Sequence, residues 1–170
     1  MSKIYLINTG FTQYIEGKLP VTSGIGMFSS CTNLTSFNGD LPSLTNANNM
    51  FSGCTNLTSF NGDLFSLTNG TYMFQSCKKL KSFNSDLSSL TSGDRMFGSA
   101  SSNCSALNLE SVQNIAETIN DLASKGLTGT IHIGMSNTLK SDDETAPINV
   151  ALAAIRAKGW TVNEVYNSIL

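Results

Sequence analysis

Charged side chains are scarce in this sequence: Asp, Glu, Lys and Arg make up 13% of its 170 residues and leave a formal net charge of −2. A surface that binds a phosphate backbone needs clustered Lys and Arg, so the composition gives no electrostatic basis for nucleic-acid binding. Apolar runs are short, and none approaches the roughly 20 residues of a membrane-spanning helix. Residues 1–10 contain one cation and a very short apolar run, unlike a secretory signal. We predict no membrane insertion, and a cytoplasmic or virion-associated protein rather than a secreted one.

Residues that typically carry catalysis are also few. The single histidine, His132, lies between Ile131 and Ile133 in a predicted strand, so its side chain should point away from theirs and reach the surface. The sequence has no Gly-x-Ser-x-Gly elbow, no Cys-x-x-Cys pair and no Gly-rich phosphate loop. The contiguous carboxylates of residues 142–144 converge poorly on a metal and suit the start of a helix. We therefore predict a protein that is not an enzyme and that uses no cofactor or metal.

A period of 23 residues dominates what is present. The dipeptide Met-Phe recurs at this interval, at Met27-Phe28, Met50-Phe51, Met73-Phe74 and Met96-Phe97. The same frame of Cys, Leu, Phe, Asn and Asp comes after each of the first three pairs. A unit of this length cannot bury its own apolar face, so the constant period predicts stacked units that share one core. Within a unit, Leu34 and Phe37 are predicted to lie on a short strand and face that core.

The run from Met50 to Phe60 resembles the repeat of BspA-type leucine-rich-repeat proteins. That repeat has a Met-Phe or Ala-Phe pair, a Cys four residues later and a Leu-x-x-Leu-type strand, and the resemblance is specific over residues 11–97. Phe at the second strand position and the many Ser, Thr and Asn residues are departures from it. Members are mostly bacterial surface, adhesion or gut-phage proteins. The resemblance therefore implies a binding scaffold and no particular ligand.

Together these features predict an α/β repeat fold, a single leucine-rich-repeat solenoid with a parallel β-sheet over residues 1–170. At 40% hydrophobic residues the chain can build one sizeable core. We assign residues 1–10 to an N-terminal cap, residues 11–109 to repeats, of which 11–28 form a degenerate first copy, and residues 110–170 to an α/β C-terminal cap.

Apolar spacing in the C-terminal cap predicts alternating helices and strands. A helix over 112–123 should end at Gly126, and a second helix over 148–155 should begin near Pro147. Strands are predicted over 127–134 and from Trp160 onward. We expect this tail to continue the parallel sheet and cover the end of the core, with Trp160 as a core plug.

Equivalent polar residues form rows with two interpretations each. Cys31, Cys54 and Cys77 should point the same way from successive units, which favours buried reduced thiols over disulfides or zinc. The Asn row (Asn38, Asn61, Asn84) and the Asp row (Asp40, Asp63, Asp86) either bind sugar, peptide or a cation, or satisfy turn amides and neighbouring units. Because the same residue type stands at the equivalent position of every unit, the structural interpretation is favoured.

One unit carries a concentration of cations, Lys78, Lys79 and Lys81, with Arg95 after them. These charges either solvate the surface or anchor an acidic partner.

The function predicted from these features is non-enzymatic recognition of a protein or glycan through the outward face of the sheet, because a repeated sheet holds many side chains rigidly. The alternatives are a structural component or decoration of a phage particle or other assembly, and an inhibitor of a host protein. The candidate binding residues are Ser36, Asn38, Ser59, Asn61, Lys81, Ser82 and Asn84.

Overall fold

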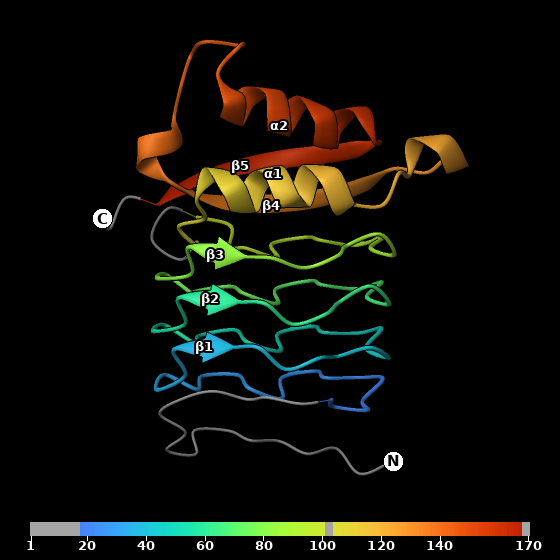
Figure 1. Ribbon diagram of the computed structural model, residues 1–170, viewed down its shortest axis with the longest axis vertical. Coiled ribbons are helices and arrows are strands. Elements are labelled where there is room, and N and C mark those ends of the chain that lie inside the picture. Colours follow the sequence, from blue (N-terminus) through green and yellow to red (C-terminus); the bar gives the residue numbers. More distant parts are fainter. Residues whose placement is uncertain (1–17, 101–103, 168–170) are drawn as a thin grey trace.

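The computed structural model describes residues 18–100 and 104–167. Segments 23 residues apart lie one above another along the long axis, and an α/β unit stands at one end (Figure 1). Three parallel strands, β1 (Ser36–Phe37), β2 (Ser59–Phe60) and β3 (Ser82–Phe83), follow this stack with Ser36 opposite Ser59 and Ser59 opposite Ser82. The predicted cap over residues 1–10 and the first part of the degenerate copy lie outside the described residues.

A second column of parallel backbone pairs runs along another wall of the stack. Asn46 pairs with Ser23 and with Asn69, and Asn69 pairs with Ser92. These pairs are isolated bridges rather than strands. The offset of 23 residues is therefore the register of both columns, and it places equivalent positions of successive segments side by side.

The turns around each Met-Phe pair contain residues in the left-handed backbone region. The residue before Met has a positive φ each time, at Gly26, Asn49, Tyr72 and Arg95. Ser30, Gly53 and Ser76 repeat the same conformation two residues after the Phe of the first three pairs. Left-handed residues interrupt right-handed helical geometry, so these segments turn without forming a helix.

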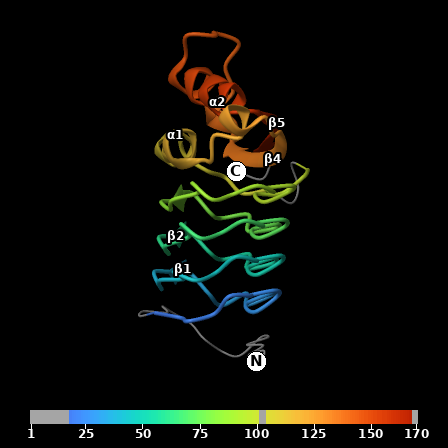
Figure 2. The same ribbon diagram turned by 90° about the vertical axis from the view of Figure 1, so that its right-hand side faces the viewer.

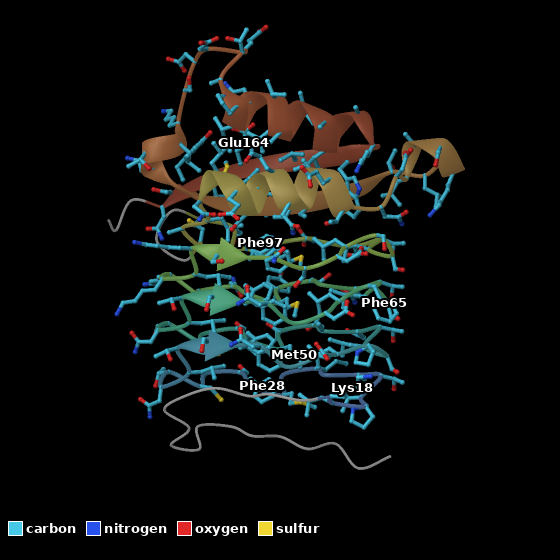
Figure 3. All side chains as sticks on the ribbon, viewed as in Figure 1. Lys18, Phe28, Met50, Phe65, Phe97 and Glu164 are labelled. Atoms are coloured by element: carbon cyan, nitrogen blue, oxygen red, sulfur yellow. The ribbon has the colours of Figure 1, made fainter. Side chains whose placement is uncertain are left out.

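Two interleaved rows of Phe fill the core. Phe37, Phe60 and Phe83 stack with ring centroids 5.2 and 5.8 Å apart. The Phe residues of the Met-Phe pairs form the second row, whose successive centroids are 5.1, 5.5 and 5.5 Å apart. Rings of different rows meet edge to face, as Phe60 and Phe74 do at 5.0 Å. Both preferred aromatic geometries thus repeat through the stack. Phe65, by contrast, lies at its margin and is 43% exposed (Figure 3).

The C-terminal unit contains α1 (Leu109–Thr118), β4 (Gly129–Ser136), α2 (Pro147–Ala157) and β5 (Trp160–Asn167). Short 3-10 helices, Ala123–Lys125 and Asn137–Leu139, flank β4. β4 and β5 are parallel, with Gly129 opposite Trp160. No helix in the described part of the chain has the length and apolar character needed to cross a bilayer.

The predicted leucine-rich-repeat solenoid with a parallel sheet is wrong. The described residues form a three-stranded sheet of two-residue strands, a separate two-stranded sheet and two α-helices. Turns confine the extended backbone: Leu34 N–H donates to Cys31 O (3.1 Å) just before β1, and Leu44 N–H donates to Leu41 O (3.0 Å) soon after it. Each segment therefore contributes only two residues to the first sheet.

The tail does not extend the sheet of β1, β2 and β3, which corrects a second prediction. β4 instead continues the second column, through bridges from Ile131 to Gly93 and from Met135 to Leu107. α1 lies beyond β3 (Figure 2). Ser111 of α1 closes that edge, because its hydroxyl accepts a hydrogen bond from Phe83 N–H (2.9 Å) and donates to Lys81 O (3.1 Å). A side chain thus supplies the acceptor for Phe83 N–H, while the backbone N–H groups of Ala106 and Asn108 donate to Leu80 O (2.9 Å) and Lys81 O (3.0 Å).

The first helix of the tail is shorter than predicted and ends at Thr118 rather than near Gly126. The chain leaves the helical path before Asn120. The Asn120 side-chain Nδ2 donates to Leu90 O (3.0 Å), and its backbone carbonyl accepts from Trp160 Nε1 (2.8 Å). Gly126, in the left-handed region, ends the next 3-10 helix instead. Trp160 is 2% exposed, which confirms its role as a core plug.

Candidate binding face

The outward face of β1, β2 and β3 holds the residues predicted to bind a partner. In each strand the Phe is buried and the preceding Ser is half-buried, as alternation across a strand requires. Ser36, Ser59 and Ser82 consequently form one outward row in register. Within the described residues, their three hydroxyls make no hydrogen bond. They remain available as both donors and acceptors.

Two side chains of the Asn row beside them form a hydrogen bond with each other. Asn61 Nδ2 donates to Asn38 Oδ1 at 2.8 Å, which supports the structural interpretation for this pair. Asn84 is exposed, and its backbone N–H donates to Phe60 O (3.0 Å). No hydrogen bond of its side-chain amide is found in residues 18–100 and 104–167. The C-terminal end of the row is therefore its open end.

Lys81 extends this open end. Its side chain is exposed, and its backbone N–H donates to Thr58 O (3.0 Å), which keeps it in line with the sheet. Lys79 instead donates to Asn56 Oδ1 at 2.8 Å. Arg95 contacts Tyr72 and His132 on the other wall. The structure therefore places Lys81 with the candidate binding face and Arg95 elsewhere, so the four predicted cations do not form one patch.

The Asp row serves the turns at two of its positions. Asp63 accepts from Phe65 N–H (3.2 Å), and Asp86 accepts from Ser88 N–H (2.7 Å). These contacts are the Asx turns expected of Asp in such loops. Among the described residues no group of three His, Cys, Asp or Glu side chains is arranged to hold a metal ion.

The cysteines are buried and unbridged. The thiols of Cys54 and Cys77 donate to Phe28 O (3.0 Å) and Phe51 O (3.1 Å). Burial raises the pKa of the Cys77 thiol well above its ordinary value and that of Cys104 to about 11. Protonated buried thiols are poor nucleophiles and metal ligands.

Comparison with known proteins gives no match: no family model, no curated protein and no solved structure is similar to this chain. The resemblance to BspA-type proteins stays a prediction from the residues alone.

Sequence reasoning missed a polar cluster formed by Tyr72, Asp94, Arg95 and His132. His132, predicted as a surface residue, has only 16% of its side chain exposed and lies 3.2 Å from Asp94 Oδ1. A signal was present in the 23-residue period. Tyr72 and Arg95 stand where earlier segments have Gly26 and Asn49, the residues that suit a left-handed backbone. Bulky residues at such positions indicate a role beyond the turn.

Proposed function

We propose that this protein is a non-enzymatic binding scaffold whose β1–β3 face recognises a protein or glycan partner. The observation that carries the proposal is the row of Ser36, Ser59 and Ser82 hydroxyls, which are in register and make no hydrogen bond within the described residues. Polar groups held on a rigid surface lose little conformational entropy when a ligand binds them. The resemblance to BspA-type repeats agrees with a binding role.

The chemistry of the face favours a hydrogen-bonding ligand. Hydroxyls and amides form its centre, while Lys81 adds a single positive charge at the open end. Such a surface suits sugar hydroxyls or the backbone and polar side chains of a protein, and it offers no apolar centre for a hydrophobic partner.

The experiment compares the wild type with a Lys81→Glu, Asn84→Ala variant, using a glycan array and affinity capture from the source proteome. Both side chains are exposed and without a partner in the described structure, so the variant is expected to fold normally. Lys140→Glu, a charge reversal in the C-terminal unit, is the charge-matched control. Binding that is lost in the double variant and kept in Lys140→Glu supports the proposal; binding retained by both variants contradicts it.

The second candidate function is a component of an assembly, and β5 is the observation that favours it. Within the described residues this eight-residue strand pairs in a sheet only with β4, and along residues 160–166 no backbone hydrogen bond is found on its other edge. An open strand edge can add a strand from a neighbouring subunit. Light scattering over a range of concentrations tests this function, which requires a defined oligomer that Glu164→Pro dissociates, because the Glu164 N–H points away from β4 in the parallel ladder.

A further inference from the structure

A cluster of polar and charged side chains lies on the wall of the second column, away from the β1–β3 face. β4 positions it, because His132 N–H donates to Gly93 O and Phe97 N–H donates to His132 O, both at 3.3 Å. These bonds fix His132 beside the turn that contains Asp94 and Arg95. His132 therefore joins the cluster because the C-terminal unit docks on this column.

His132 holds the backbone of Arg95 in place. Arg95 N–H donates to His132 Nδ1 at 3.0 Å, so the neutral imidazole carries its proton on Nε2. Asp94 Oδ1 lies 3.2 Å from the same nitrogen. The other residue facing the ring by register is the neutral Asn163 of β5. His132 thus acts as a positioning residue for Arg95, and with its proton on Nε2 it donates no hydrogen bond to the nearby carboxylate.

Arg95 adopts a backbone conformation that arginine disfavours. Its φ is 51°, in the left-handed region, at a position that Gly26 and Asn49 occupy in earlier segments. Residues held in such conformations cluster at functional sites, where the surrounding structure supports them. The local turn alone does not explain an arginine here.

The Arg95 side chain is preorganised and lacks a counter-ion. Its guanidinium carbon lies 5.3 Å from the centre of the Tyr72 ring, and Nη1 donates to the Tyr72 hydroxyl. The ion pairs found in the described residues join His132 to Asp94 and Arg156 to Glu164, so neither includes Arg95. Stacking on an aromatic ring limits the freedom of the guanidinium but leaves its other N–H groups open to a ligand.

We propose that Arg95, stacked on Tyr72 and braced by His132, binds one oxyanion group of an acidic ligand: a carboxylate, phosphate or sulfate. The planar fork of a guanidinium matches the paired oxygens of these groups, and its positive charge complements theirs. The site is separate from the face proposed above, so each can fail without the other.

The test is a nuclear magnetic resonance titration of the intact chain at pH 7.5. His132 is the single histidine of the sequence, so its ring signals need no assignment by mutation. Sodium acetate, phosphate and sulfate are added in separate arms, with ionic strength held constant by sodium chloride. We expect saturable shifts of the Arg95 Nε–H and His132 ring signals in at least one arm, and the arms distinguish a carboxylate from a tetrahedral anion. Shifts that never saturate, or none beyond those in chloride, overturn the proposal.

Variants locate the response. Arg95→Gln should abolish the saturable His132 shift, whereas Lys140→Gln, which removes a cation from the C-terminal unit, should leave it unchanged. A saturable response that persists in Arg95→Gln also overturns the assignment. If Arg95→Gln does not fold, the wild-type titration, read at the Arg95 Nε–H signal, decides alone.

Discussion

At the scale of single residues, the left-handed positions around each Met-Phe pair offer a direct test of backbone strain. Ser76 has a φ of 62° and is equivalent to Gly53, with a φ of 78°. We expect Ser76→Gly to raise the free energy of unfolding by about 0.5–1 kcal/mol, because relief of the left-handed strain exceeds the entropy cost of glycine. Thermal denaturation should show a rise of about 1–4 °C.

The reverse substitution is the matched control for this prediction. A Cβ added at Gly53 would lie 3.3 Å from Ser30 Oγ, and the backbone there is left-handed. Gly53→Ser should therefore lower the melting temperature. A Ser76→Gly protein that melts below the wild type would show that its backbone is not strained.

His132 gives a pH dependence whose sign is set by its surroundings. Burial lowers its pKa below the ordinary 6.5, Asp94 opposes this, and Arg95 adds to it. The unfolded chain therefore binds the proton more readily than the folded one, so this contribution to stability is present above about pH 6.5 and is lost as the pH falls. We expect the melting temperature to decrease from pH 7.5 to 5.5, and to decrease less in His132→Gln.

Asp94→Asn gives a second test of the pH dependence of stability that His132 causes. Without the carboxylate the pKa of His132 should fall further, because the group that favours the imidazolium is gone. The difference between folded and unfolded pKa values then grows, and the loss of stability on acidification should exceed that of the wild type. An identical pH profile in all three proteins would exclude His132 as the titrating group.

At the scale of elements, Ser111 decides how the first sheet ends. Its side chain is buried and supplies the acceptor for Phe83 N–H at the edge of β3. Ser111→Ala leaves this buried donor without a partner, which should cost about 1–3 kcal/mol in the free energy of unfolding. Urea denaturation measures the loss, and Ser124→Ala, at an exposed site outside this edge, serves as the control.

Hydrogen exchange locates the same effect. The Phe83 amide should exchange faster in Ser111→Ala than in the wild type, while amides of β1 stay protected. Equal exchange of Phe83 in both proteins would mean that another group closes the edge.

At the scale of the whole molecule, the interleaved Phe rows join successive segments into one core. Phe60 is fully buried and contacts rings from both neighbouring segments, Phe37 and Phe83. Phe60→Ala should cost about 3–5 kcal/mol in the free energy of unfolding, since a cavity would open between segments. Phe65→Ala, at an exposed site, should cost far less. Chemical denaturation with comparable costs for both would contradict the role assigned to the rows.

The sequence predicted the core more accurately than the architecture. Phe37, Phe60 and Phe83 were recognised as one row because a constant period puts them at equivalent positions, and the structure stacks them. The solenoid with a continuous sheet was wrong, because the period does not reveal how few residues of each segment are extended. In the binding face, the register aligned the Ser row correctly. Asn61 bonds Asn38 while the Asn84 side chain makes no hydrogen bond in the described residues, a difference that identical residues at equal spacing do not reveal.

The sequence by itself determined which side chains of successive segments lie together, since equal spacing repeats the same local geometry. Only the tertiary structure decided where the C-terminal unit docks, where α1 ends and what surrounds His132. These features rest on contacts between distant positions, such as Asn120 with Leu90 and Arg95 with His132, which are 30 and 37 residues apart. Residues that do not repeat carry no periodic signal of their partners, so packing alone brings them together.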